Sequence, residues 1–172
     1  KETKNSEIAI TGMAVRFPEA YTPEEFYSNL LNKIDSVRDY PKARRKLTDP
    51  WLPDEVCDTE EPYQRQAYID HISEFDEHFF KLSIAEAKVM EPLQRLFMMC
   101  AYEALEDANC TNTKLQDLKV GIYVGNAELG QPRYKDLSEK LDGTGFVGGA
   151  NSMMPARIAY YLNLKGPAIT LD

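Results

Sequence analysis

The sequence predicts a layered α/β domain with a mainly parallel sheet, and two observations support this fold class. Three runs of small and β-branched residues lack polar alternation, which is typical of strands buried on both faces. Segments whose apolar residues recur at helical spacing lie between these runs. Strands that alternate with helices favour parallel pairing with helical crossovers. The predicted strands are Ile8–Val15, Lys119–Gly125 and Ala168–Leu171.

The composition is that of an ordinary globular protein. The chain has 172 residues, of which 43% are hydrophobic and 28% are charged, enough for one domain with a core. The net charge of −8 makes a nucleic acid an unfavourable partner. No apolar run approaches the ~20 residues of a membrane span. Residues 1–7 form a polar lead-in unlike a secretory signal, so a cytoplasmic location is expected.

Cysteine and histidine residues give no sign of a metal site. The three cysteines lack CxxC spacing, which argues against a zinc knuckle or a disulfide framework. Cys100 is predicted to pack in the core, whereas Cys57 and Cys110 lie in polar, loop-like contexts. His71 and His78 flank an acidic stretch, which is better explained as a solvated face than as a metal site.

The first helix is predicted to begin after Thr22, whose hydroxyl can cap it. Pro23 suits the first helical position, and Glu25 completes a capping box three residues after Thr22. Apolar residues then follow at helical spacing, namely Phe26, Leu30, Leu31 and Ile34.

Residues 36–81 show little regular pattern, which indicates a functional surface, an interface or an insertion. The only dense basic run, Lys42–Lys46, is predicted to be a solvated loop.

Two further helices are predicted in the middle of the chain. A capping box from Ser83 to Glu86 opens a short helix, and Pro92 fits the first turn of a longer one that ends near Asn109. Arg95 is expected to form a structural ion pair. The apolar stripe of the longer helix consists of Leu93, Leu96, Phe97, Cys100, Ala101, Ala104, Leu105 and Ala108.

The last helix is predicted over Ser152–Leu162, with Pro155 in its first turn and Ser152 as its N-cap. The preceding Gly143–Gly149 segment lacks the lysine and hydroxyl residue of a P-loop, so phosphate binding there is disfavoured. A turn at Lys165–Pro167 leads into the final strand. If this final core strand is uncovered, the isolated chain is expected to self-associate or to need a partner.

Four segments together resemble the ketosynthase domain of modular polyketide synthases. In the order in which the family has them, they are Ile8–Pro18, Phe75–Phe80 with Glu91–Leu96, Tyr102–Ala108, and Ala156–Ala168. The resemblance implies a thiolase-like (beta-ketoacyl synthase) fold over residues 8–172, incomplete and truncated before the nucleophile helix. Asn163–Ala168 is most similar to synthases whose acyltransferases act in trans. The departures from the family pattern, which concern capping and packing, are Ile84, Glu91, Leu93 and Pro155.

The resemblance also implies a function. In the family, a "TACSSS" motif with the nucleophilic cysteine follows the strand that matches Ala168–Leu171, and two histidines come later. We therefore expect the catalytic residues after Asp172 and no activity from this chain alone. The complete domain takes an acyl chain from the phosphopantetheine of an acyl carrier protein and extends it by decarboxylative Claisen condensation, with no bound cofactor. The alternative is a non-catalytic structural half of a split ketosynthase that a second polypeptide completes.

Two groups of site residues follow from the same resemblance, which implies a homodimer of the complete domain. The strand that pairs across the two-fold axis of the dimer matches Ala168, Ile169, Thr170 and Leu171. The segment that approaches the partner's acyl tunnel matches Asn151, Ser152, Met153 and Met154, although a helix start with core packing explains these four equally well.

Overall fold

The computed structural model describes residues 7–51, 63–110, 114–115, 118–126 and 150–171. The chain divides into two compact units, a larger one of residues 1–14 and 72–172 and a smaller one of residues 15–71. None of the helices in the described part is long and apolar enough to cross a membrane.

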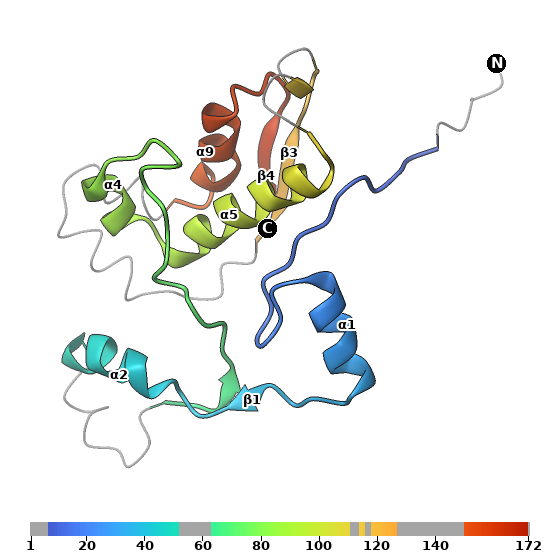
Figure 1. Cartoon of the computed structure of the whole chain (residues 1–172). Helices are drawn as coiled ribbons and strands as arrows, with labels where there is room; N and C mark the ends of the chain where they lie inside the picture. The colour runs from blue at the N-terminus through green and yellow to red at the C-terminus, as the bar shows by residue number, and fades with distance from the viewer. Residues whose placement is uncertain (1–6, 52–62, 111–113, 116–117, 127–149, 172) are drawn as a thin grey trace. The chain divides into compact units, whose positions relative to one another are not determined.

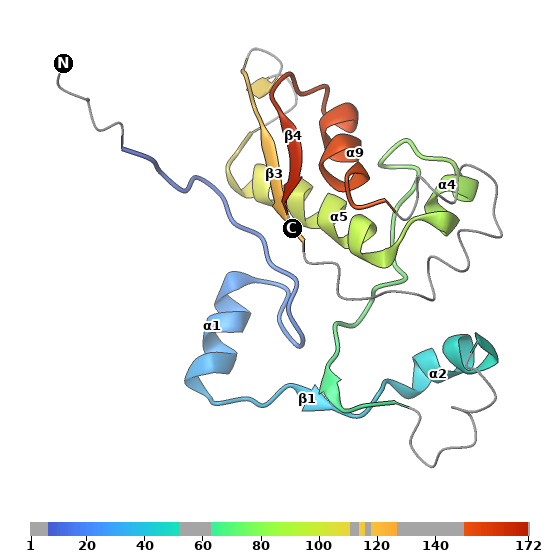
Figure 2. The same cartoon turned by 180° about the vertical axis from the view of Figure 1, so that it is seen from behind.

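The larger unit contains a small parallel sheet with helices packed on it. Strands β3 and β4 pair in parallel, from Ile122 opposite Ala168 to Gly125 opposite Leu171. Helix α9 packs on both strands and α5 packs on α9, as Figures 1 and 2 show from opposite sides. This arrangement confirms the last two predicted strands, although β3 is shorter than predicted. The elements are α4 (Ile84–Val89), α5 (Pro92–Asp107), β3 (Ile122–Gly125), α9 (Met153–Tyr161) and β4 (Ala168–Leu171).

Local sequence signals set the ends of α4 and α5, as predicted. The Ser83 hydroxyl accepts a hydrogen bond from the Glu86 amide, and the Glu86 carboxylate accepts one from the Ser83 amide. Pro92 occupies the first turn of α5. Beyond its C-terminus, Asn109 has a φ of 51°, the left-handed conformation that ends many helices.

The core of the larger unit lies between α5 and α9. Its fully buried members include Met90, Met98 and Ile158. The face of α5 toward this core is rotated from the predicted stripe, because Gln94 and Met98 are buried while Leu93 is 43% exposed. The predicted stripe spans more than one side of the helix, and α9 covers only one of them.

An aromatic cluster joins the loop before α4 to both core helices. The rings of Phe79 and Tyr102 meet edge to face with centroids 4.9 Å apart, and those of Phe80 and Tyr161 lie 5.2 Å apart. The Tyr161 hydroxyl also donates a hydrogen bond to the Phe79 carbonyl over 3.0 Å. These contacts hold the Phe75–Phe80 segment against the helices.

The prediction of a buried strand at Ile8–Val15 is wrong. Residues 7–16 have no regular secondary structure, and Ile8 and Ile10 are 95% and 81% exposed. A β-branched run forms a strand only where a neighbouring backbone supplies hydrogen bonds, and within the described residues β3 pairs only with β4. The Met13 amide instead donates to the Asp107 carboxylate at 2.8 Å. Gly12 lies so close to α5 that a Cβ atom there would come within 2.3 Å of the Ala104 carbonyl oxygen.

The smaller unit is built from short elements. Thr22 and Glu25 form the predicted capping box at the start of the first helix. Of the apolar residues at helical spacing, Phe26 is half-buried against Phe17, whereas Leu30, Leu31 and Ile34 are 60%, 64% and 51% exposed. The elements are α1 (Pro23–Leu31), β1 (Val37–Arg38), α2 (Lys42–Thr48), η1 (Asp49–Trp51) and β2 (Gln66–Ala67), with β1 and β2 antiparallel.

The basic run Lys42–Lys46 is a helix and not the predicted loop. Lysine and arginine are good helix formers, and Pro41 precedes the first turn. Arg44 and Arg45 are half-buried, and the Arg45 guanidinium lies 5.5 Å from the centroid of the Tyr63 ring. The prediction therefore failed because it treated the run as charge alone and ignored the aromatic residues that it packs against.

Candidate functional site

The segment Asn151–Met154 begins α9, and its four side chains differ in exposure. Met154 is buried in the core, Met153 is half-buried, and Ser152 is exposed. Ser152 occupies the predicted N-cap position, but its backbone is already helical (φ −61°, ψ −18°) and its side chain makes no capping hydrogen bond. The predicted capping role of its hydroxyl is therefore wrong.

The structure brings the two predicted groups of site residues together. The Thr170 hydroxyl on β4 donates a hydrogen bond to the Asn151 carbonyl over 3.1 Å. On the same strand Ala168, Ile169 and Leu171 are exposed, whereas Thr170 is half-buried. The start of α9 is therefore tied to β4, which leaves most of the side chains of that strand uncovered in the described part of the chain.

A buried glutamine, which the sequence did not single out, holds the start of α9 in place. Gln94 is completely buried, and its side-chain amide donates to the Ala150 carbonyl over 3.0 Å. Its amide oxygen accepts a hydrogen bond from the Arg157 Nε over 3.2 Å. The sequence feature that could have identified Gln94 is a glutamine within a helix predicted to be apolar, because a buried amide needs polar partners.

Arg95, the neighbour of Gln94, does not show the predicted ion pair among the described residues. Its Nε is buried without a hydrogen-bond partner.

A cavity of about 830 Å³ lies beside α9, within the size range of ligand pockets. Its wall is largely aromatic and aliphatic, and Lys81, Glu86 and Arg157 supply charge. Cavities of this composition can hold an apolar group with a polar end. The lining residues are Phe80, Lys81, Leu82, Glu86, Met98, Met153, Ala156, Arg157, Tyr160, Tyr161 and Asn163.

Two charged groups of this cavity influence each other's ionisation. Burial lowers the pKa of the Arg157 guanidinium, and the Glu86 carboxylate opposes that shift. Hydrogen bonds from Ser83 lower the pKa of Glu86, and the charge of Arg157 contributes in the same direction. Glu86 is therefore ionised at neutral pH, which suits it to position other groups and not to transfer protons.

Replacing Glu86 with glutamine is expected to reduce the loss of folding stability that occurs when the pH falls below 4.5. The pKa of Glu86 in the folded state lies below its ordinary value of 4.5, so its charge stabilises the fold above pH 4.5. That stabilisation is lost as the pH falls through the folded-state value. Solvent screening limits the effect to about 1 kcal/mol.

Urea unfolding of wild type and Glu86→Gln from pH 3 to 7 measures this difference. Glutamine can keep the capping hydrogen bonds, so the two curves should separate at pH 7 and converge near pH 3. A constant gap across the range would show that the charge of Glu86 does not contribute.

The remaining candidate residues are cysteines, histidines and a glycine-rich segment. Cys110 lies in a loop after α5, as predicted, but it packs against the apolar core cluster and not in polar surroundings. Cys100 is half-buried. His71 meets the Tyr21 ring edge-on at 6.0 Å. Among the described residues, no group of three histidine, cysteine or acidic side chains could hold a metal ion. Cys57 and Gly143–Gly149 lie outside the described residues.

The sequence matches one family model, "Beta-ketoacyl synthase, N-terminal domain", over residues 5–172. Pikromycin polyketide synthase component PikAII of Streptomyces venezuelae is 34% identical over 168 residues, 96% of this chain and 4% of that protein. Polyketide synthase PksL of Bacillus subtilis is 33% identical over 171 residues, again 96% and 4%. The chain therefore spans a small fraction of these relatives.

Solved structures give the same result. The ketosynthase from module 6 of the bacillaene synthase of Bacillus subtilis 168 is 32% identical with a TM-score of 0.71, over 95% of this chain and 26% of that one. The oxazolomycin ketosynthase domain OzmH KS7 of Streptomyces albus is 28% identical with a TM-score of 0.77, over 97% and 29%. The chain thus matches about a quarter of the length of these ketosynthase chains.

Proposed function

Because the chain belongs to the beta-ketoacyl synthase N-terminal domain family, with the thiolase-like fold of polyketide synthase ketosynthases, we propose that it is the N-terminal part of such an enzyme. The complete ketosynthase would accept an acyl chain from the phosphopantetheine of a carrier protein and extend it by decarboxylative Claisen condensation. The match over residues 5–172 is the observation that carries this proposal. The Asn163–Ala168 motif supports a place among synthases served by acyltransferases in trans.

In this proposal the chain supplies a scaffold and the nucleophile follows Asp172. Parallel strands β3 and β4 end together, and catalytic groups of α/β sheets gather at the carboxyl ends of such strands. A cysteine placed there at the start of a helix gains thiolate character from the helix dipole. The half-buried Cys100 and Cys110 are assigned to packing.

The start of α9 and strand β4 are proposed to shape the acyl site and the dimer interface. Among the four α9 candidates, Met153 is favoured for contact with the acyl chain because it lines a cavity, whereas Met154 is buried in the core. The exposed side chains of Ile169 and Leu171 support pairing of β4 with a second copy. The proposed partners are the rest of the ketosynthase, an acyl carrier protein and a second copy of the complete domain.

Complementation tests the proposed function. We expect no thioester on the chain alone when it is incubated with an acylated carrier protein. Adding a polypeptide that supplies the family's remaining length after Asp172 should produce acylation of the added cysteine, detected by intact mass spectrometry. The matched control carries alanine in place of that cysteine.

The two alternatives give different outcomes. Association without acylation would favour the structural half of a split enzyme. Acylation of Cys100 or Cys110 followed by carbon–carbon bond formation by the chain alone would contradict the proposal.

A further inference from the structure

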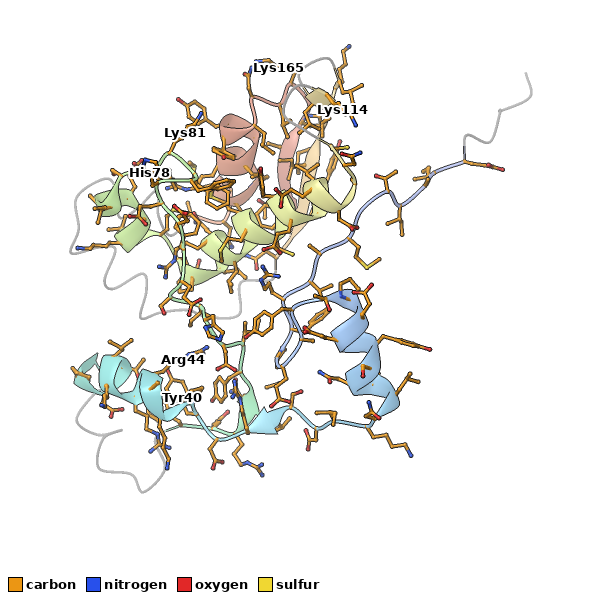
Figure 3. All side chains as sticks on the ribbon, viewed as in Figure 1. Tyr40, Arg44, His78, Lys81, Lys114 and Lys165 are labelled. Atoms are coloured by element: carbon orange, nitrogen blue, oxygen red, sulfur yellow. The ribbon has the colours of Figure 1, made fainter. Side chains whose placement is uncertain are left out.

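The smaller unit contains a compact group of arginine and tyrosine side chains, here called the Arg/Tyr cluster. The rings of Tyr40 and Tyr63 stack with centroids 4.0 Å apart, and the ring of Tyr68 meets Tyr40 edge-on at 5.1 Å. Figure 3 labels Tyr40, which precedes α2, and Arg44, which belongs to that helix. The cluster consists of Arg38, Tyr40, Arg44, Arg45, Tyr63 and Tyr68.

The arginines of the Arg/Tyr cluster lie near its tyrosines in different ways. A terminal nitrogen of Arg38 donates to the Tyr68 carbonyl over 3.0 Å. The charge of Arg44 lies close enough to Tyr68 to lower its pKa against the larger effect of burial. Arg45 lies over the ring of Tyr63. Because the ring of Tyr40 contacts those of Tyr63 and Tyr68, the three tyrosines form one aromatic group beside these arginines.

These guanidinium groups have hydrogen-bonding capacity that the described residues do not use. The Nε atoms of Arg38 and Arg45 and one terminal nitrogen of Arg44 are buried without a hydrogen-bond partner. Buried donors of this kind are rare in proteins, and an unpaired one is costly. All three side chains are only partly buried as a whole, so small rotations can present their donors to a ligand from solvent.

The acidic side chains within residues 37–51 and 63–71 are already engaged. Asp70 pairs with Arg38, Asp39 pairs with Arg65, and Asp49 accepts a hydrogen bond from the Tyr63 hydroxyl over 2.6 Å. Residues 37–51 and 63–71 contain six lysine and arginine residues against three aspartates. These two stretches therefore have a local positive excess in a chain whose net charge is −8.

We propose that the Arg/Tyr cluster binds a phosphate group, with Arg44 and Arg45 as its principal ligands. The planar guanidinium presents paired donors that match two phosphate oxygens, and two such groups can share one dianion. The Tyr63 ring holds Arg45 in place, so binding requires little ordering of that long side chain. Arg38 contributes less, since Asp70 already neutralises its charge.

Phosphorus NMR titrations of the full 172-residue chain, at constant ionic strength in chloride, test this site. Inorganic phosphate and glycerol 3-phosphate are titrated separately, because the first is the free ion and the second carries its phosphate on an organic group. Saturable binding that chloride does not abolish is expected for at least one of them. The ligand that binds more tightly identifies the source that the site favours.

Four variants distinguish a specific phosphate site from general charge attraction. Arg44→Gln and Arg45→Gln should each weaken binding about tenfold, which corresponds to the loss of one charged hydrogen-bonding group. Lys46→Gln removes the same charge from an exposed position on the same helix and should change affinity less than about twofold. Arg44→Lys keeps the charge but loses the paired donors, so it should fall between wild type and Arg44→Gln.

Three results would overturn the proposal. One is equal weakening by Lys46→Gln and Arg44→Gln, which would indicate charge attraction alone. Another is unchanged affinity in Arg44→Gln and Arg45→Gln, with helix content equal to wild type by circular dichroism. The third is absence of phosphate binding in wild type, as expected if the five acidic residues of segment 52–62 satisfy the arginines.

Discussion

Replacing Gly166 with alanine is expected to destabilise the larger unit severely. A Cβ atom at this position would come within 2.2 Å of the Val120 carbonyl oxygen and within 2.6 Å of the Gly121 nitrogen. Both are backbone atoms that cannot turn away as a side chain can. The Gly166 amide also donates to that carbonyl over 3.0 Å, just before β4 joins β3. Relief of the clash would therefore disturb the start of the sheet, at a cost of about 3 kcal/mol.

Urea denaturation of wild type and Gly166→Ala measures this cost. The matched control is Gly125→Ala at the far end of β3, where an added Cβ would meet no atom within 4 Å. That control should leave the free energy of unfolding within about 0.5 kcal/mol of wild type. Similar free energies of unfolding for Gly166→Ala and Gly125→Ala would show that Val120 and Gly166 are not packed as described.

Replacing Ile158 with alanine is the second change with a large expected effect. Ile158 is completely buried at the centre of the core between α5 and α9. Loss of three carbon atoms removes apolar contacts and leaves a cavity, because the helices cannot close over the gap. Such substitutions destabilise by about 2–5 kcal/mol. The unfolding midpoint in urea should fall without a change in its slope.

Ile8→Ala is the matched control for this substitution. It removes the same atoms from a side chain that is 95% exposed, so the stability should change by less than about 0.5 kcal/mol. If Ile8→Ala were as destabilising as Ile158→Ala, residues 7–16 would be part of a core that the described structure lacks.

Features specified by neighbouring residues could be predicted from the sequence. The capping boxes at Thr22 and Ser83 each depend on a residue three positions away, and both helices begin where predicted. The parallel pairing of β3 with β4 followed from the alternation of strands and helices. The assignment to a family rested on the order of four segments, which the comparisons support.

Features that depend on distant contacts could not be predicted. The Ile8–Val15 run has the composition of a strand, but no pattern within it tells whether a neighbouring strand is present. Helix α2 depends on packing of Arg45 against Tyr63, a residue in a different segment. The role of Gln94 depends on Ala150 and Arg157, so sequence reasoning could place Gln94 on a helix but not identify its partners.

Because Gln94 pairs with residues much later in the chain, the ribosome synthesises α5 before the helix that covers it. Arg157 comes 63 positions after Gln94, and translation adds about 5–20 residues per second. Roughly 3–13 s therefore pass between the emergence of α5 and the arrival of the helix that covers it. During that interval Met98 and the aromatic residues near it are not covered by α9. Chaperones that act on nascent chains can bind these apolar side chains at that stage.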